Sequence, residues 1–205
     1  MQVFYIHPEN PQPRLIEQVA DLLRKDQLII YPTDTSYAFG CRLGAKDALE
    51  KLKQIRALDD KHQFTLLCRD LSEIANYAAV DNVQFKQLKA HTPAPITFIL
   101  NATKDVPKKL AHAKKKTIGI RVPSNAIAQA LLEAMDEPIL TSSLILPNHD
   151  DILDDPFEIE ELLGNQIDGL INAGIKTTKL TTIVDMTSSQ PEIIRQGAAD
   201  VSSLL

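Results

Sequence analysis

Short apolar runs alternate along the chain with longer segments in which apolar residues recur every three or four positions. The short runs are typical of buried strands, and the longer segments have the spacing of one buried helix face. We predict strands at residues 3–6, 28–31, 64–68, 96–100, 117–122, 138–147, 167–171, 181–185 and 193–195. We predict helices at residues 14–25, 45–57, 71–77, 82–89, 125–135 and 157–163. Ser124 is the expected N-cap of the fifth helix, because a serine hydroxyl accepts a hydrogen bond from the first turn.

This order of elements indicates the fold class. Interleaved strands and helices favour an α/β domain, built on a large sheet with helices on its faces. Some neighbouring strands are joined by loops without a helix, which favours a mixed sheet over a purely parallel one. No linker-like segment divides the chain, so we expect a single domain over residues 1–205.

The strongest candidate for a functional stretch begins with the apolar run at 28–31, which Pro32 should end because proline cannot donate to a sheet ladder. The four residues after Pro32 would then aim hydroxyls and a carboxylate into a cleft. Tyr37 and Phe39 would wall that cleft, and Gly40 would allow a sharp departure. The alternative is a polar turn in which Thr and Asp side chains bond their own backbone.

Composition narrows the function classes. The 205 residues are 44% hydrophobic and 24% charged, which is ordinary for a globular protein with a sizeable core. The net charge of −5 excludes a uniformly basic nucleic-acid binder, so anion binding must come from a local patch. Cys41 and Cys68 have no second cysteine at metal-binding spacing, so we expect two reduced core thiols. The N-terminus lacks the pattern of a signal peptide, and no apolar run is long enough to span a membrane; we expect a cytoplasmic protein.

Hydroxyls and arginines recur where the predicted strands end. If these ends converge, they form a cleft suited to a phosphate or a carboxylate, which arginine binds through two parallel hydrogen bonds. For each residue taken alone, the alternative is an ordinary strand threonine or a solvated arginine. The residues concerned are Thr33, Thr35, Thr97, Arg121, Thr141–Ser143, Thr181, Thr182 and Arg195.

Other site classes find little support. The chain has no glycine-rich phosphate loop, no zinc-like cluster and no glycine-flanked serine nucleophile, so we predict no metal centre. The acidic loop at 147–156, with Asp150, Asp151, Asp154 and Asp155, lacks the order of ligands in a calcium loop and is expected to be solvated.

Residues 103–116 are the most basic stretch of the chain. The lysines there would contact a nucleic-acid backbone, or they would form a solvated helix face. They are Lys104, Lys108, Lys109, Lys114, Lys115 and Lys116.

Several motifs together resemble the YrdC/YciO family, in order and over nearly the whole chain. The stretch Pro32-Thr-Asp-Thr-Ser-Tyr-Ala-Phe-Gly40 resembles its opening motif, and Ile118-Gly-Ile-Arg-Val-Pro123 resembles its arginine strand. Thr181–Asp185 and Arg195-Gln-Gly197 resemble its C-terminal pair. The YciO branch is the more similar one, on the evidence of three segments: residues 4–8, 62–71 and 117–125.

The resemblance implies a twisted, mixed open sheet with a large, positively charged concave face, with a YrdC-like core at about residues 12–200. It implies an L-threonylcarbamoyladenylate synthase, which forms threonylcarbamoyl-AMP from L-threonine, bicarbonate and ATP and releases pyrophosphate. That product feeds the threonylcarbamoyl modification of adenosine in tRNA. ATP would be a substrate that brings Mg²⁺, with no organic prosthetic group, and family members have also been regarded as binders of double-stranded RNA.

The resemblance also implies a role for individual residues. Arg56 and Arg121 would be the catalytic residues, with Arg56 on the ATP phosphates and Arg121 on the threonine carboxylate. The threonine site would further include Thr35, Thr141 and Thr181, and the nucleotide site Thr97, Ser143 and Arg195. A patch for RNA would comprise Lys108, Lys109, Lys114, Lys115 and Lys116.

Three positions depart from the synthase pattern. Gln54 stands where the synthases have the lysine of a Lys-x-Arg motif, and Ile145 stands where they have the asparagine of a Ser-Ala-Asn triplet. Arg69 aligns loosely with a histidine. These departures define the alternative hypothesis, an RNA-binding or nucleotide-binding paralogue with little synthase activity.

Overall fold

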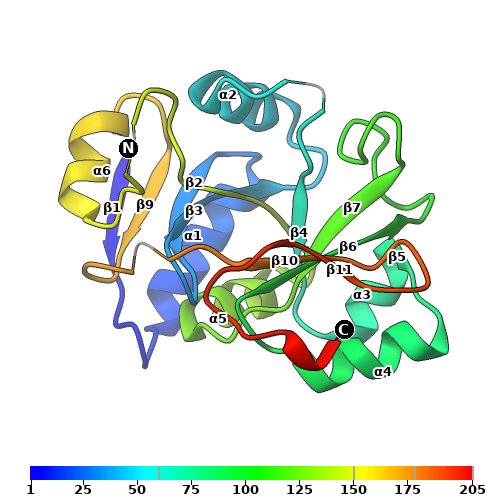
Figure 1. Cartoon of the computed structure of the whole chain (residues 1–205). Coiled ribbons are helices and arrows are strands. Elements are labelled where there is room, and N and C mark those ends of the chain that lie inside the picture. Colours follow the sequence, from blue (N-terminus) through cyan, green and yellow to red (C-terminus); the bar gives the residue numbers. More distant parts are fainter. Residues whose placement is uncertain (60, 150, 178, 205) are drawn as a thin grey trace.

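A mixed β-sheet runs through the molecule and carries helices on its faces (Figure 1). The computed structural model describes residues 1–59, 61–149, 151–177 and 179–204. The strands are β1 (Gln2–Tyr5), β2 (Ile29–Pro32), β3 (Tyr37–Arg42), β4 (Thr65–Leu67), β5 (Ala78–Ala79), β6 (Ile96–Ala102), β7 (Thr117–Arg121), β8 (Ile139–Ser143), β9 (Gly169–Asn172), β10 (Thr182–Asp185) and β11 (Glu192–Arg195). The helices are α1 (Pro13–Arg24), α2 (Lys46–Arg56), α3 (Leu71–Tyr77), α4 (Asn82–His91), α5 (Ala126–Met135) and α6 (Pro156–Leu163), with a short 3₁₀ turn at Ser202–Leu204.

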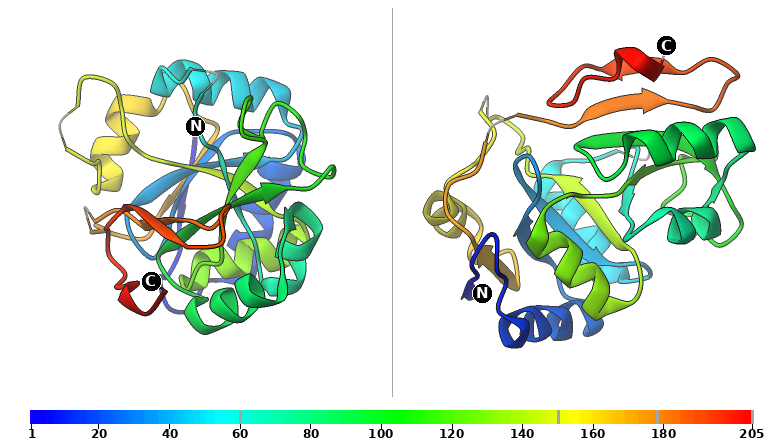
Figure 2. Two further views of the ribbon diagram at one scale, coloured as in Figure 1. Left: turned by 45° about the vertical axis from the view of Figure 1, so that its right-hand side comes forward. Right: turned by 90° about the horizontal axis from the view of Figure 1, so that it is seen from below.

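The sheet is open and mixed, as the sequence predicts. Its strand order is β1-β9-β2-β3-β8-β4-β7-β6-β10-β11, and β5 pairs with β6 at one side. The pairs β1–β9, β2–β9, β4–β7 and β6–β10 are parallel, and the remaining pairs are antiparallel. Figure 2 shows the sheet curving from β1 and β9 at one edge to β10 and β11 at the other.

Alternation along the central strands divides the core between two faces. In β2, Ile30 faces a large apolar cluster that includes residues of α2, α3, α4 and α6, whereas Ile29 and Tyr31 face a second cluster with α1 and α5. This is the side-chain period of a strand that is buried on both faces. The sheet therefore forms a rigid scaffold that positions the ends of its central strands.

All six predicted helices are present, and their ends agree with the prediction within two residues. One detail was wrong: the N-cap of α5 is Asn125, whose side chain accepts a hydrogen bond from the Ala128 amide at 3.0 Å. Ser124 instead donates to Asp34, from both its amide and its hydroxyl. Ser124 is thus a hydrogen-bond partner of Asp34 and not the cap of the helix.

The prediction for residues 37–40 was also wrong. They begin β3, which pairs antiparallel with β2, so Tyr37 and Phe39 are fully buried in the core and do not wall a cleft. Gly40 lies inside the strand, where a Cβ atom would be 2.8 Å from Cε1 of Tyr31. The glycine is thus required by close packing against a tyrosine ring and not by a sharp departure of the chain.

Two further segments differ from the expectations. Residues 103–116 form turns and loop between β6 and β7 and contain no helix, so the solvated helix face is excluded. The strand predicted over 138–147 is limited to β8, because the chain turns away after Ser143.

Cys41 and Cys68 are free and buried, and burial raises the pKa of the Cys41 thiol to about 12. The described residues contain no group of three or more His, Cys, Asp or Glu side chains that would hold a metal ion. In the acidic loop, Asp155 accepts a hydrogen bond from the Phe157 amide and caps α6, while Asp150 lies outside the described residues. None of the described helices has the length and apolar character needed to cross a membrane.

Candidate functional site

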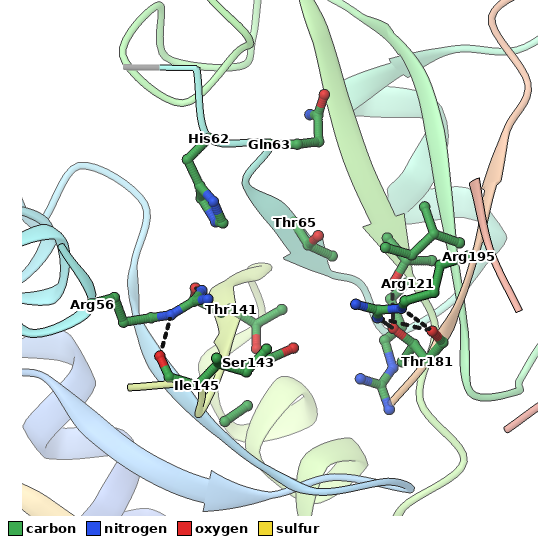
Figure 3. A pocket seen from close by; sticks show the side chains of 14 residues that line it. Arg56, His62, Gln63, Thr65, Arg121, Thr141, Ser143, Ile145, Thr181 and Arg195 are labelled. Carbon is green, nitrogen blue, oxygen red and sulfur yellow. Dashed lines mark hydrogen bonds between the residues drawn. The ribbon is translucent and has the colours of Figure 1, made fainter. Parts of the chain in front are cut away.

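A cleft of about 600 Å³, partly open to solvent, lies where several strands of the sheet end (Figure 3). Most of its lining side chains carry a hydroxyl, an amide or a positive charge. They are Ala38, Arg56, His62, Gln63, Thr65, Thr97, Arg121, Thr141, Ser142, Ser143, Ile145, Thr181, Ile183 and Arg195. The convergence of strand-end residues that the sequence suggested is therefore present in part, since Thr33, Thr35 and Thr182 do not line the cleft. The predicted residues that do line it are Thr97, Arg121, Thr141–Ser143, Thr181 and Arg195.

Arg121, the last residue of β7, is the most deeply buried charge in the cleft, with 6% of its surface exposed. Its Nη2 atom forms an ion pair with Asp34 and lies 3.4 Å from Oγ1 of Thr35. Asp34 in turn accepts hydrogen bonds from the amide and hydroxyl of Ser124, at 3.3 and 3.2 Å. The β2–β3 turn and the segment before α5 thus fix the arginine from two sides.

The polar stretch after Pro32 forms the turn that was the alternative interpretation, and none of residues 33–36 lines the cleft. The Thr33 hydroxyl donates to the Ser36 carbonyl at 2.7 Å and accepts from the Thr35 amide at 3.1 Å, which is a side-chain-stabilised turn. The same turn places Asp34 and Thr35 against Arg121. The turn is therefore the structural device that positions the arginine.

Arg195, the last residue of β11, is held by Thr181 just before β10. Its Nε and Nη2 atoms donate to the Thr181 carbonyl at 3.0 and 2.9 Å, and Nη2 also donates to Thr181 Oγ1 at 3.0 Å. The hydroxyl of Thr97 donates to Thr181 Oγ1 at 3.4 Å. A glycine at 197 permits this arrangement, because a Cβ atom there would be 2.4 Å from the Leu180 carbonyl oxygen.

Arg56 enters the cleft from the opposite side to Arg121 and Arg195 (Figure 3). It is the last residue of α2, and its Nε atom donates to the Ile145 carbonyl at 3.1 Å. Its Nη1 atom donates to the Ser142 hydroxyl of β8. Three guanidinium groups from three separate elements therefore converge on one cleft.

No aspartate or glutamate is among the described residues that line the cleft. Burial lowers the pKa of Arg56 to about 10, and burial together with nearby Arg195 lowers the pKa of Arg121 to about 10. Burial also lowers the pKa of Arg195. Burial therefore disfavours the positive charges of Arg56 and Arg195, whereas the charge of Arg121 is already paired with Asp34. A bound anion would stabilise Arg56 and Arg195, and the cleft is electrostatically suited to phosphate and carboxylate groups.

His62 and Gln63 also line the cleft, and neither was predicted as a site residue. The His62 ring packs edge-to-face on Phe64, with centroids 4.9 Å apart and an interplanar angle of 79°. Gln63 exchanges hydrogen bonds with Thr117, at 3.2 Å to its carbonyl and 2.9 Å from its hydroxyl. The available signal was the match of segment 62–71 to the YciO branch, which carried no role for either side chain.

His62 makes the stability of the protein depend on pH. Burial, followed by the charge of Arg56, lowers the pKa of His62 from 6.5 to about 4, against the opposing effect of Asp59. Between these two values the unfolded chain binds a proton that the folded protein does not. The free energy of unfolding therefore falls as the pH drops from about 6.5 towards 4, and this contribution is fully present above pH 6.5.

The free energy of unfolding of the wild type should fall between pH 7 and pH 5. In a His62→Gln variant we expect this fall to be smaller by about 1 kcal/mol, after allowance for the partial exposure of the ring. Urea unfolding at the two pH values measures the difference. His149→Gln, at an exposed position, is the control, and its free energy of unfolding should change with pH as that of the wild type does. If the free energy of unfolding falls by the same amount in His62→Gln and in the wild type between the two pH values, this account is wrong.

Seven of the eight residues expected in the threonine and nucleotide sites line the cleft. They are Arg56, Thr97, Arg121, Thr141, Ser143, Thr181 and Arg195. Thr35 lies behind the lining, against Arg121, and Asp34 is the neighbouring residue whose role only the structure reveals.

The five lysines expected in an RNA patch are all exposed on the β6–β7 loop and do not line the cleft. They are Lys108, Lys109, Lys114, Lys115 and Lys116.

The three departures from the synthase pattern lie in different environments. Ile145 lines the cleft, and its carbonyl holds Arg56. Gln54 is exposed on α2 and is not part of the lining. Arg69 also lies outside the lining and pairs with Asp136 at 3.0 Å.

Comparison with known proteins places these observations in a family. A family model named Sua5_yciO_yrdC, with the description "Telomere recombination", matches residues 21–197. The uncharacterized protein YciO of Escherichia coli strain K12 is 51% identical over 204 residues, which is 100% of this chain and 99% of that protein. An uncharacterized protein of Haemophilus influenzae strain Rd is 47% identical over 205 residues, with 100% and 99% of the two chains covered.

Solved structures show the same fold. The crystal structure of E. coli YciO matches with a TM-score of 0.96 at 51% identity, over 100% of this chain and 99% of that one. The crystal structure of P. abyssi Sua5 complexed with L-threonine matches with a TM-score of 0.87 at 20% identity, over 96% of this chain and 58% of that one.

Proposed function

This chain belongs to the Sua5/YciO/YrdC family, and from that premise we propose that its cleft binds L-threonine and ATP and joins them, through bicarbonate, into threonylcarbamoyl-AMP. The structure of P. abyssi Sua5 with L-threonine, which shares the fold, supports threonine as the small substrate. The chain would then be an L-threonylcarbamoyladenylate synthase that serves the modification of adenosine in tRNA.

The observation that carries the proposal is the set of three guanidinium groups in a cleft whose described lining contains no carboxylate. An enzyme that brings a carboxylate and a triphosphate together must compensate several negative charges at once. Arginines are suited to this because each guanidinium offers five N–H donors in a planar fork. Hydroxyls of Thr141, Ser143 and Thr181 add neutral donors and acceptors between the charges.

Arg121 is the proposed site of the threonine carboxylate. Its ion pair with Asp34 occupies one side of the guanidinium, and its Nε atom is buried without a hydrogen-bond partner among the described residues. A buried donor without a partner is costly, so a ligand carboxylate there would be favourable. Thr141 and Thr181 line the cleft, and Thr35 contacts Arg121 from behind the lining.

The nucleotide is proposed to lie towards Arg56, with Ser143 and Thr97 along its path and Arg195 near the reacting phosphate. Arg56 keeps donors that its bonds to Ile145 and Ser142 do not use. Because the described lining offers no carboxylate ligands, Mg²⁺ would enter on the phosphates of ATP, where it neutralises charge.

The proposed reaction needs positioning and charge stabilisation more than a strong base. The threonine amine adds to bicarbonate with loss of water, which gives a carbamate. A carbamate oxygen then attacks the α-phosphorus of ATP, and the bond to the β-phosphate oxygen breaks to release pyrophosphate. Negative charge builds on the α-phosphate in this step, and fixed arginines stabilise such charge.

Identification of the product tests the proposal. The protein is incubated with ATP, L-threonine and ¹³C-bicarbonate, and the mixture is analysed by mass spectrometry with a known active synthase as a positive control. The expected product is an adenylate of carbamoylated threonine that carries the ¹³C label. A folded protein that forms no labelled adenylate under conditions in which the control does would contradict the synthase proposal.

RNA binding is the second candidate, and the exposed lysines at the C-terminal end of the β6–β7 loop favour it. They adjoin Thr117, which bonds Gln63 at the rim of the cleft. A triple change of Lys114, Lys115 and Lys116 to glutamate should weaken binding of a short RNA duplex at least about tenfold and reduce its salt dependence. Unchanged affinity of this variant in a filter-binding assay would remove these lysines from an RNA interface.

A further inference from the structure

A second pocket lies at the N-terminal end of α2, whereas Arg56 at the C-terminal end of this helix lines the cleft. The pocket has a volume of about 500 Å³ and is partly open to solvent. It lies between the start of α2 and the turn that contains Pro107 and Leu110. In Figure 2 these two parts are the cyan helix and the green loop, which lie near each other in the left view. None of the residues that line the cleft lines this pocket.

The walls of the pocket are aliphatic. Ala45 and Leu49 come from the α2 region, Leu110 from the β6–β7 loop and Leu140 from β8, and all four belong to the large apolar cluster of the core. The pocket is therefore a place where the core can be reached from outside. An aliphatic side chain inserted there would be removed from water on most sides.

The rim of the pocket is basic. Lys46, Lys108 and Lys109 border it, are exposed, and form no ion pair with another described residue. Arg42 also borders it, but this arginine is paired with Asp26 and Glu137. No described lining residue is acidic, so the rim presents uncompensated positive charge around an apolar centre.

From this combination we infer that the pocket is a docking site for an acidic segment of a partner protein, with one aliphatic side chain inserted between Leu49 and Leu110 and carboxylates on the three lysines. Nucleic acid fits less well, because none of the described residues that line the pocket has an aromatic side chain for a base to stack on. The two ends of α2 link this site to the cleft: Lys46 begins the helix at the pocket, and Arg56 ends it in the cleft. The two ends of this helix lie about 15 Å apart.

The test uses the full chain and fluorescence anisotropy. The probe is a fluorescein-labelled peptide with one leucine between two runs of glutamate, and its control has serine in place of the leucine. Binding of the leucine peptide that is at least about tenfold tighter than that of the serine peptide is expected. Equal affinities would show attraction by charge alone and would overturn the inference, as would the absence of binding by the leucine peptide.

Two matched double variants distinguish the pocket from a general basic loop. Lys108→Glu with Lys109→Glu should weaken binding of the leucine peptide at least about tenfold. Lys114→Glu with Lys115→Glu makes the same charge change on the same loop but outside the pocket, and it should change the affinity for this peptide less than about threefold. Both variants alter exposed side chains and should fold. Equal loss in the two variants, or binding of an RNA duplex with no binding of the peptide, would contradict a peptide site.

Self-association is a separate outcome of the same test. If the wild type forms dimers in a concentration-dependent manner on sedimentation, and Lys108→Glu with Lys109→Glu abolishes them, the occupant is a second copy of the chain and the inference of a separate acidic partner is wrong. The rate of the proposed adenylate synthesis should be equal in all these variants, since none alters a residue of the cleft. The docking test is therefore independent of whether the synthase proposal holds.

Discussion

An Arg121→Met variant is expected to release pyrophosphate in the threonine-dependent reaction at a rate at least about a hundredfold lower than the wild type. Arg121 is the buried guanidinium that we propose for the threonine carboxylate, and methionine preserves much of its volume but no donor. Removal of the arginine also leaves Asp34 buried without its ion-pair partner, which costs about 3–5 kcal/mol of folding stability. Thermal unfolding should accordingly shift down by about 10 °C.

A second change separates the loss of activity from the loss of stability. In the double variant Asp34→Asn with Arg121→Met, no buried charge is left unpaired, so much of the stability should return while activity stays low. Arg69→Met is the control, because Arg69 is a partly exposed arginine that pairs with Asp136 outside the cleft. It should keep wild-type activity and lose less than about 1 kcal/mol. Recovery of activity in the double variant would show that Arg121 acts only through folding.

The second large effect concerns the nucleotide end of the cleft. Arg56→Met is expected to raise the KM for ATP by about 10- to 100-fold, the equivalent of one lost charged hydrogen bond to a phosphate. The KM for threonine should change by less than about threefold, because Arg56 lies across the cleft from Arg121. Initial rates over a matrix of the two substrate concentrations give both constants.

Lys51→Met is the matched control for Arg56. Lys51 is a cation on the same helix, but it pairs with Asp168 at 3.3 Å and does not line the cleft. Its replacement should leave both KM values within about twofold of the wild type. An Arg56→Met variant that raised the KM for threonine and not for ATP would reverse the assignment of the two ends.

Much of the fold was predictable because its signals are local. The apolar spacing of each helix repeats within its own segment, so all six helices were found. β3 was missed because Pro32 and Gly40 both suggest turns, and because the tight contact between Gly40 and the Tyr31 ring comes from a neighbouring strand. The basic stretch 103–116 is not helical, since Pro107 interrupts it and Lys116 has a backbone φ of +53°.

The site was less predictable, since its geometry depends on contacts between distant positions. The strand-end arginines and threonines were visible in the sequence, and the structure brings Arg56, Arg121 and Arg195 into one cleft. The pairing of Asp34 with Arg121 joins two motifs far apart in the chain, and no local pattern encodes it. His62 lies in a loop without periodicity, so its position over the cleft follows only from the path of the chain between α2 and β4.

Ile145 shows how the structure refines the comparison with the synthase pattern. The side chain at this position lines the cleft and contributes no polar group, so the nucleotide would be held on that side by Ser143 and by Arg56, which the Ile145 carbonyl fixes. Gln54, in contrast, is exposed away from the lining. Of these two departures, only Ile145 changes the surface that a nucleotide would meet.

The measurement that tests the proposed function most directly is release of pyrophosphate from ATP in reactions that contain or omit L-threonine and bicarbonate. The three arginines and the hydroxyl-lined cleft predict release that requires both small substrates and is lost in Arg121→Met. If the folded protein releases no pyrophosphate, or releases it at the same rate without threonine, while an active synthase shows the full dependence, the cleft does not perform this reaction.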